Sequence, residues 1–460
     1  MNTDRTGGSG ASALARPAGE RTAAFLAEVA EDLSQGVLSP RVFSDPDVYE
    51  LEIERIFSRC WVYVGHVTEI PDAGDYVLRY IGRDQFILSR DESGGINLLL
   101  NNCMHRATRI CHAEKGNTSH FRCPYHGWIY RNNGDWNGAP QRRRAYGDKL
   151  DPRQWGLRRA PHVDTYQGLI FANLDPAAIS LADYLGDMRW YLDVTFGLSQ
   201  AGMRTVGDPH RWQVPANWKS GAENFAADAY HVPNLHRSGE ETGTFPNIAA
   251  ALNRQFHIAI NGGHGMVANT GFLPEPWKYG GWAPEVAEIF DLGKLPPDQR
   301  AFVESGTCLT VATIFPNLSI IRVPAVLDPN STPPILFTAI RQWQPLAPGL
   351  TEIWSWPMEW AAAPAEFNRL SYDTGVGSFG PSGVFEQDDT VAWMGPVQAG
   401  DSHFGRRAGM KLNYQLGEGG KDGFGINHEW QYPGTATTTV YDEFNQRRFY
   451  QRWQQEVAGQ

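Results

Sequence analysis

The sequence predicts an α+β protein in which an all-β domain precedes a larger domain that combines helices with an antiparallel sheet. From Trp61 onward, short β-rich runs separated by Gly, Pro and Asp turns predict the all-β domain over residues 60–176. Beyond Leu181, helical spacing mixes with paired strand-like runs, which predicts the larger domain over residues 177–460. A chain of 460 residues, 42% of them hydrophobic, is long enough for two domains and a sizeable core.

The N-terminal part is predicted to be a tail followed by helices. Residues 1–20 are rich in Gly, Ser, Ala and Arg and lack the apolar core of a signal peptide, which predicts a disordered tail. The run TAAFLAEVAEDLSQG predicts an amphipathic helix that ends at Gly36. Asp45 before Pro46 predicts the N-cap and the first position of a second helix.

Hydrophobic patterning predicts the later elements. Strands of the all-β domain are predicted for WVYVGHV, DYVLRYI, QFILSR and INLLLNN. Helices are predicted for ADYLGDMRWYLDVTFG and for the C-terminal TVYDEFNQRRFYQRWQQEV. Strands of the antiparallel sheet are predicted for RWQVPANW, TVATIFPNLSIIRV, PILFTAIRQWQPL and TEIWSWPMEW. Residues 398–434, rich in Gly and Asp, predict a long excursion from the core.

Composition excludes several classes of function. The net charge of −11 argues against binding nucleic acid through its phosphates and against docking on an anionic membrane. No apolar run approaches the roughly 20 residues that span a bilayer. The five cysteines are too few and odd in number for a disulfide framework. With no export signal, reduced thiols and a cytoplasmic location are expected.

Two short loops carry the first cluster of metal-ligating residues. Cys103-x-His105 is followed, after 17 residues, by Cys123-x-x-His126. A zinc finger normally sets a cysteine pair against a histidine pair. A Rieske [2Fe–2S] cluster instead needs two thiolates on one iron and two imidazoles on the other. Because each loop supplies one of each, the pattern favours a Rieske cluster, and a structural zinc site is the alternative.

The segment GAENFAADAYHVPNLHRS carries the second cluster. On a helix, Asp228 and His231 would share one face, with His236 closing in from the helix end. Two imidazoles and one carboxylate form the facial triad of non-haem Fe(II) oxygenases. Asp228 suits a supporting position beside His231 better than a ligand position. The third ligand could then come from FGPSGVFEQDDTVAW, which offers three carboxylates: Glu386, Asp388 and Asp389.

The two clusters are complementary in chemistry. A Rieske cluster only carries electrons, whereas a mononuclear iron that reduces dioxygen needs an electron source. Together the motifs CMH with CPYHGW, AENFAADAYHVPNLH, TIFPNLS and FGPSGVFEQDD occur in the same order as in a known family. From about Ser44 to its C-terminal helix, the chain resembles the large (alpha) subunits of Rieske non-haem iron ring-hydroxylating dioxygenases. It looks most similar to the naphthalene, biphenyl and toluene dioxygenase branch.

The resemblance implies an architecture and a set of site residues. The all-β Rieske domain would be inserted in a catalytic domain that has an antiparallel β-sheet flanked by helices, so residues 21–59 would form the N-terminal part of the catalytic domain. The [2Fe–2S] cluster would be held by Cys103, His105, Cys123 and His126. The catalytic Fe(II) would be held by His231, His236 and Asp389. The residues expected to line the iron pocket are Asn224, Phe225, Val232, Phe379 and Phe385.

Two carboxylates receive supporting roles from the resemblance. Asp228 would link a Rieske histidine of one subunit to an iron histidine of the next, and it would thereby carry electrons to His231. Asp388 would serve as a helix cap or as a residue behind an iron ligand.

The chain departs from the family pattern at three positions. Many relatives have Arg-Gly after the first loop histidine, where this chain has Arg106-Ala107, and a change in loop packing is expected. Naphthalene-type relatives tend to carry a pocket histidine in the region where Val311 stands here. Arg322 interrupts the apolar strand LSIIRVPAV, so it is expected to form a salt bridge or to bind a substrate carboxylate.

The expected function is that of a terminal oxygenase component in the catabolism of aromatic compounds. It would take electrons from a ferredoxin or reductase and add both atoms of dioxygen to an aromatic ring, giving a cis-dihydrodiol. No G-x-G-x-x-G follows a predicted strand, so the chain should not bind NADH. The resemblance implies a trimer of large subunits, usually completed by three small (beta) subunits. The alternatives are a Rieske monooxygenase or demethylase of the same architecture and, from another class, a pure electron-transfer protein.

Overall fold

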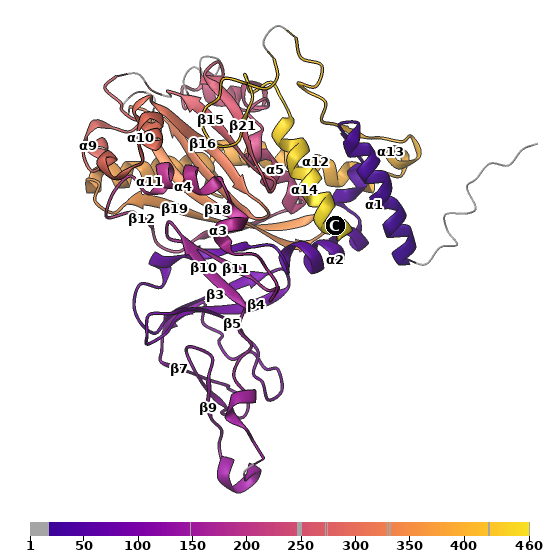
Figure 1. The fold of residues 1–460 in the computed structure, drawn as a ribbon, viewed down its shortest axis with the longest axis vertical. Helices are drawn as coiled ribbons and strands as arrows, with labels where there is room; N and C mark the ends of the chain where they lie inside the picture. Colours follow the sequence, from indigo (N-terminus) through magenta and orange to yellow (C-terminus); the bar gives the residue numbers. More distant parts are fainter. Residues whose placement is uncertain are drawn as a thin grey trace, which may run out of the picture.

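The α+β architecture predicted from the sequence is confirmed. The computed structural model describes residues 18–459 except 148, 246–250, 272, 274, 329, 331, 332, 422 and 423. A narrow all-β lobe projects from a broad body in which helices flank a large sheet (Figure 1). The chain enters the body first, builds the lobe and then returns to the body.

The N-terminal segment belongs to the body. Residues 1–17 of the expected disordered tail lie outside the described residues. The boundary at residue 20 was wrong, because helix α1 (Ala18–Ser34) already begins at Ala18. Alanine favours the helix, Glu20 interacts well with the first turn, and α1 packs against the C-terminal helix α14 (Phe444–Ala458).

The second predicted helix begins as expected. Asp45 is the N-cap of α2 (Pro46–Leu51), and its Oδ1 accepts a hydrogen bond from the Asp47 amide at 2.8 Å. Pro46 is the first helical residue, a position at which the backbone N–H makes no intrahelical hydrogen bond, so proline is tolerated there. The chain continues directly into a π-helical turn, η3 (Glu52–Phe57).

Glu52 joins this N-terminal segment to the catalytic part of the chain. Its buried carboxylate pairs with the Lys219 ammonium. It also accepts hydrogen bonds from the indole N–H groups of Trp218, at 2.9 Å, and Trp453, at 2.7 Å. Three groups from two distant segments therefore depend on one buried charge.

Replacing Glu52 with alanine is expected to destabilise the protein by about 3–5 kcal/mol, because the Lys219 charge would stay buried without a partner. Glu54→Ala, two residues away on an exposed position, is the matched control and should cost less than about 0.5 kcal/mol. Denaturant unfolding of the two variants measures the difference. Equal losses of unfolding free energy in the two variants would show that the buried ion pair does not stabilise the protein more than an exposed side chain does.

The lobe contains two small antiparallel sheets. The four-stranded sheet has the order β5-β4-β3-β6 and the three-stranded sheet the order β7-β8-β9. Their strands are β3 (Asp75–Ile81), β4 (Asp84–Arg90), β5 (Ile96–Leu100), β6 (Lys115–Asn117), β7 (His120–Arg122), β8 (Ile129–Arg131) and β9 (Trp136–Gly138). A core of their own, rich in aromatic side chains such as Trp128 and Tyr130, stabilises them.

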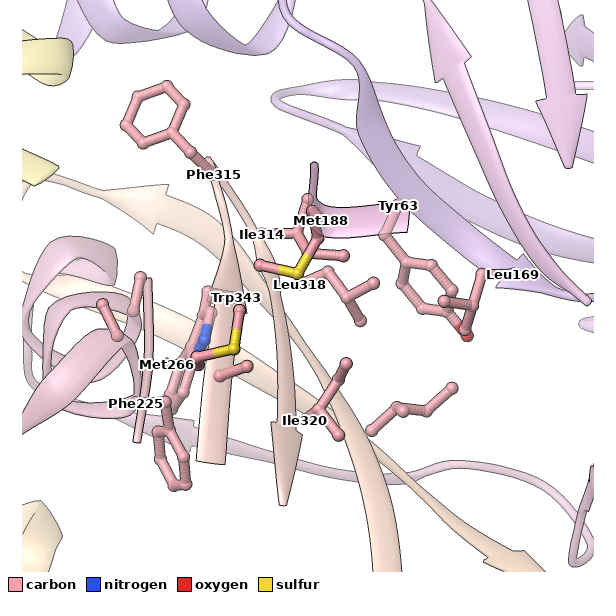
Figure 2. Close-up of a cluster of buried hydrophobic side chains, with 14 of the residues drawn as sticks. Tyr63, Leu169, Met188, Phe225, Met266, Ile314, Phe315, Leu318, Ile320 and Trp343 are labelled. Carbon is pink, nitrogen blue, oxygen red and sulfur yellow. The ribbon is translucent and has the colours of Figure 1, made fainter. Parts of the chain in front are cut away.

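A third sheet connects the lobe with the body. It has the order β10-β11-β2, with β2 (Val62–His66), β10 (His162–Tyr166) and β11 (Leu169–Asn173). Figure 2 shows Tyr63 and Leu169 of this sheet beside Ile314 and Leu318 of the body, within one cluster of buried side chains. Asn317 adds two hydrogen bonds to the backbone of Tyr63, at 2.9 and 3.1 Å. The lobe is therefore anchored to the body through a continuous core.

The body is built on a nine-stranded antiparallel sheet. Its order is β12-β19-β18-β17-β16-β15-β14-β21, and β13 pairs with β19. The strands are β12 (Met203–Thr205), β13 (His210–Val214), β14 (Gln255–Ile260), β15 (His264–Thr270), β16 (Thr307–Ile314), β17 (Leu318–Ala325), β18 (Ile335–Ala347), β19 (Leu350–Trp360) and β21 (Thr435–Ala436). The strands predicted from hydrophobic patterning in this part of the chain are confirmed, except that the strand predicted for RWQVPANW ends at Val214 and its last residue, Trp218, begins a helix.

Helices cover the sheet. The long ones are α5 (Trp218–Ala227), α11 (Ala365–Phe379), α12 (Val384–Asp401) and α14; α5 and α14 pack on β15, and α11 packs on β18 and β19. The helix predicted for ADYLGDMRWYLDVTFG is two helices, α3 (Leu181–Leu185) and α4 (Met188–Phe196). Gly186 separates them because its φ of 49° leaves the right-handed helical region.

The remaining described elements are short. They are β1 (Val37–Leu38), η2 (Pro40–Phe43), η4 (Val67–Glu69), η5 (Arg142–Tyr146), η6 (Pro152–Gln154), α6 (Val232–Leu235), α7 (Arg237–Glu241), α9 (Pro284–Ala287), η7 (Leu292–Lys294), α10 (Pro297–Glu304), α13 (His403–Arg407) and β20 (Leu412–Asn413). The described part of residues 398–434 contains only the end of α12, α13 and β20, in agreement with the predicted excursion.

Candidate metal centres and substrate cavity

Two equivalent turns in the lobe present the Cys/His pairs. In the first, the Ala107 amide donates to the Cys103 carbonyl at 2.8 Å; in the second, the Gly127 amide donates to the Cys123 carbonyl at 3.0 Å. Each turn is closed by a further backbone bond from its cysteine amide. Both cysteines are buried, and the two turns bring their ligand residues together from different sheets.

The two cysteines lie beside each other, and so do the two histidines. The rings of His105 and His126 lie with their centroids 4.5 Å apart. Burial raises the pKa of the Cys103 thiol, and the neighbouring Cys123 thiol raises it further. Nδ1 of His105 is buried and has no hydrogen-bond partner among the described residues. A thiol pair beside an imidazole pair, with an unpaired ring nitrogen, fits a [2Fe–2S] group with sulfur on one iron and nitrogen on the other.

The zinc alternative fits less well. A single tetrahedral ion needs all of its donor atoms within reach of one point. The four side chains of these loops do not form such a compact group in the part of the chain that the structure describes. Neighbouring side chains also hold the ligands in place, as is usual around an iron–sulfur cluster. The Tyr130 hydroxyl lies 3.2 Å from the Cys103 sulfur, and Trp128 stacks on the His105 ring.

Ala107 occupies a position that favours glycine. Its φ is 56°, and Gly127 at the equivalent place in the second turn has a φ of 68°. A Cβ in the left-handed region costs roughly 1–2 kcal/mol. The departure from Arg-Gly was expected to change loop packing, but Ala107 is exposed and the structure shows backbone strain instead.

Ala107→Gly is therefore expected to stabilise the lobe by about 1 kcal/mol, after subtracting the greater chain entropy of glycine in the unfolded state. Gly127→Ala is the reciprocal control and should destabilise, since its new Cβ would also lie 3.0 Å from Pro140. Thermal unfolding, followed through loss of the cluster absorbance, measures both shifts. A lower melting temperature for Ala107→Gly would contradict the strain argument.

The second cluster lies where α5 ends. The expectation that Asp228 and His231 share a helix face was wrong, because α5 ends at Ala227 and Asp228 has a φ of −97° and a ψ of 83°. His231 precedes the short helix α6, which Pro233 helps to start. The side chains still meet: His231 Nδ1 lies 3.3 Å from Asp228 Oδ1.

Three donor atoms converge in this region. His231 Nε2 and His236 Nε2 are 3.3 Å apart, and Asp389 Oδ1 lies 3.4 and 3.2 Å from them. Ligands bound at right angles on one metal at about 2.1 Å are roughly 3 Å apart. Asp389 Oδ1 is buried and makes no well-oriented hydrogen bond among the described residues. The triangle therefore has the size and chemistry of a facial two-histidine, one-carboxylate site.

Each imidazole is backed by its own carboxylate. Asp228 stands behind His231, and Asp388 Oδ2 lies 3.3 Å from His236 Nδ1. The predicted role of Asp388 as a helix cap was wrong, because α12 begins at Val384 and its N-cap is Gly383. A carboxylate that accepts the Nδ1–H keeps the Nε2 lone pair directed at a metal.

The electrostatics of the triangle favour a cation. Burial raises the pKa of Asp389, but the two imidazoles outweigh burial and lower it to about 2. Burial lowers the pKa of His231, but Asp228 and Asp389 raise it well above its usual value. The negative potential that favours a proton on His231 equally favours a metal ion between these three side chains.

A largely apolar cavity of about 80 Å³ opens onto the triangle. The structure places all five predicted pocket residues on its wall, together with Val311 and Asp228: Asn224, Phe225, Val232, Phe379 and Phe385. Sequence reasoning missed further lining residues, namely Ala229, Phe245, Ala251, Leu252, Gln255, Val267, Thr310 and Val323. Alternation along β15 and β17 could have indicated Val267 and Val323, but only with the register of the sheet known.

Arg322 makes neither expected contact within the described part of this chain. It is buried, no described carboxylate lies within ion-pairing distance, and the cavity wall is formed by its neighbour Val323 instead. Its guanidinium lies 4.8 Å from the centre of the Trp282 ring and 3.5 Å from the Tyr279 carbonyl. Within this chain a cation–π contact on the far face of the sheet thus replaces the predicted salt bridge or substrate contact, while a salt bridge to another subunit stays a prediction.

Comparisons with known proteins agree with this geometry. Residues 60–166 match the Rieske [2Fe-2S] domain, and residues 181–458 match the ring hydroxylating alpha subunit catalytic domain. The chain belongs to the family of ring-hydroxylating alpha subunits. It is an oxidoreductase of a family that carries a Rieske cluster and a mononuclear iron. The presence of the catalytic domain excludes the interpretation as an electron-transfer protein alone.

Individual relatives span nearly the whole chain. It is 40% identical to the N,N-dimethyl phenylurea N-demethylase subunit alpha of Sphingobium sp., over 94% of each chain. It is 34% identical to the biphenyl dioxygenase subunit alpha of Paraburkholderia xenovorans, over 92% of this chain and 91% of that one. Naphthalene 1,2-dioxygenase from Rhodococcus sp., solved with bound indole, superposes with a TM-score of 0.88 at 40% identity, covering 96% and 99% of the chains. In the described residues, no helix has both the length and the apolar character needed to span a membrane.

Proposed function

We propose that the protein is the terminal oxygenase that adds both atoms of dioxygen to an aromatic substrate, giving a cis-dihydrodiol. The observation that carries the proposal is the convergence of an apolar cavity on the triangle of His231, His236 and Asp389. A facial triad leaves coordination positions open on one side. The apolar wall is suited to a hydrocarbon ring held beside those positions.

We assign the metal ligands as the family pattern implies. Cys103, His105, Cys123 and His126 would hold the [2Fe–2S] cluster, and His231, His236 and Asp389 the ferrous ion. When bound, the cluster supplies single electrons and the ferrous ion supplies the reduction of dioxygen. Asp228 and Asp388 hold the Nδ1 protons of the two imidazoles, and Phe225, Phe379 and Phe385 exclude water and orient the ring.

Electron delivery is proposed to cross between subunits. The Rieske turns lie in the projecting lobe, away from α5 in the same chain (Figure 1). In the lobe Tyr125 is 58% exposed, and the adjacent His126 is only half-buried. Asp228 retains 30% exposure of its side chain, so a neighbouring subunit's His126 could reach it. A trimer of this chain, completed by three small beta subunits and supplied by a ferredoxin and a reductase in the cytoplasm, is the assembly that we propose.

Product analysis with labelled dioxygen tests the proposed reaction. The purified holoenzyme, supplied with ferredoxin, reductase and NADH, is incubated with naphthalene or biphenyl under ¹⁸O₂. Two labelled oxygens on adjacent ring carbons are expected. A singly labelled product would assign the chain to the monooxygenases instead, and no oxidation of any arene in the presence of intact metal centres would refute the proposal.

N-demethylation is the second candidate. It is favoured by the 40% identity with the phenylurea N-demethylase subunit alpha, a value higher than that with the biphenyl enzyme. Formaldehyde release from an N-methylated aryl urea, compared with diol formation from biphenyl by the same preparation, distinguishes the two reactions.

A further inference from the structure

The cavity has few polar groups apart from the triangle and its two supporting residues Asn224 and Asp228. Among its lining residues only Gln255 and Thr310 add a polar side chain to an otherwise apolar wall. The Thr310 hydroxyl already donates to the Val267 carbonyl at 3.0 Å, so it serves the sheet. The amide of Asn224 lies 3.5 Å from both Asp228 and His231, so it serves the iron site.

Gln255 differs from these residues. It is the first residue of β14, where the backbone pairs with Asn269 of β15 and the side chain reaches the cavity. Its amide has no hydrogen-bond partner among the described residues, and it is only half-buried. A primary amide offers both N–H donors and a carbonyl acceptor. When a ligand displaces water from the cavity, these groups stay unpaired unless the ligand itself pairs them.

We propose that Gln255 binds a neutral hydrogen-bonding substituent of the aromatic substrate, and that an aryl amide or aryl urea fits it best. Such a group carries a carbonyl acceptor next to an N–H donor, so it can pair with both sides of the glutamine amide. A ketone pairs with the donor alone, and a hydrocarbon pairs with neither. This inference rests on the proposed function and specifies the substrate of the same site.

The charges on the cavity wall favour a neutral substituent. Asp228 and Asp389 line the cavity, whereas none of its described lining residues is a lysine or an arginine. The nearby Arg322 is turned away towards Trp282. The charge of a bound ferrous ion would be balanced by these two carboxylates, so no further cation on the described wall would pair with an aromatic carboxylate, which would face the glutamine carbonyl as well. Amides and ureas avoid both costs.

Binding of shape-matched ligands tests the inference. Acetanilide is compared with 2-methyl-1-phenylpropene, in which carbon replaces the amide nitrogen and oxygen. Titration calorimetry on the oxidised, anaerobic holoenzyme measures Kd without turnover. The wild type is expected to bind acetanilide about tenfold or more tightly than the hydrocarbon, in keeping with hydrogen bonds that would otherwise be unmade.

Gln255→Met keeps the length of the side chain and removes the amide, and Gln255→Leu provides a second apolar variant. Both should lose the preference for acetanilide and bind the hydrocarbon at least as well as the wild type, which also shows that the cavity is intact. Gln213→Met makes the same change at an exposed position of β13 and should keep the wild-type ratio of affinities.

The possible failures are distinguishable. A wild type that binds both ligands equally, or a Gln255→Met variant that keeps the wild-type ratio, overturns the role of Gln255 while arene oxidation stands. If neither ligand binds and no arene is oxidised, the proposed function itself fails, and the assignment of Gln255 fails with it.

Discussion

Asp389→Ala is expected to release the mononuclear iron and to lower ring oxidation about a thousandfold or more, while the Rieske spectrum stays unchanged. Asp389 Oδ1 lies within 3.4 Å of both imidazole Nε2 atoms, so its loss leaves two neutral ligands and an open site. A catalytic metal contributes several kcal/mol to its reaction, and each 1.36 kcal/mol is a factor of ten in rate. Iron content per chain, together with the EPR signal of the reduced cluster, measures both centres separately.

Asp388→Ala is the control for this prediction. Asp388 contacts His236 on the side away from the triangle, so its loss should cost about 10–100-fold in activity or metal affinity. The assignment of ligands would be wrong if the Asp388 variant lost its iron and the Asp389 variant kept it. His231→Ala and His236→Ala should behave like Asp389→Ala, since each removes one corner of the same triangle.

Asp228→Ala is expected to keep both metal centres and the trimer but to lose nearly all coupled turnover. A carboxylate that only supports an iron ligand is worth about 10–100-fold. A larger loss is expected here because Asp228 would also accept a hydrogen bond from His126 of the partner subunit. Asp228→Asn should fail too, since an amide has lost the negative charge and offers one acceptor oxygen in place of two.

A single-turnover experiment distinguishes these two roles of Asp228. The Rieske cluster is reduced beforehand, substrate and dioxygen are added, and reoxidation of the cluster is followed by its absorbance. The Asp228 variants should reoxidise far more slowly than the wild type, whereas Asp388→Ala, which also removes a carboxylate behind an imidazole, should be slowed by no more than its loss of activity of about 10–100-fold. Wild-type rates in Asp228→Ala would remove Asp228 from the electron path.

Much of the fold was predictable because local chemistry determined it. Asp45 followed by Pro46 predicted a helix start from capping geometry alone, and alternating patterns predicted the strands of both domains. The prediction failed where tertiary packing or backbone conformation determines the ends of a helix. The helix boundary at Ala18 depends on contact with α14, and the break at Gly186 depends on a backbone conformation that no side chain specifies.

For the site, the sequence by itself determined the kinds of donor and their grouping: two Cys/His loops, a histidine pair and an acidic pair, in an order specific enough to identify the family. Only the tertiary structure decided how they meet. Asp228 and His231 come together across a helix end, not along a helix face, and Asp389 reaches them from a helix far away in the chain. The same holds for the cavity, where Val323 faces inward and Arg322 outward, and where no described residue pairs with the Gln255 amide. Sheet register and long-range packing determine these contacts, and neither can be deduced from the local sequence, since a shift of one residue in a strand exchanges its two faces.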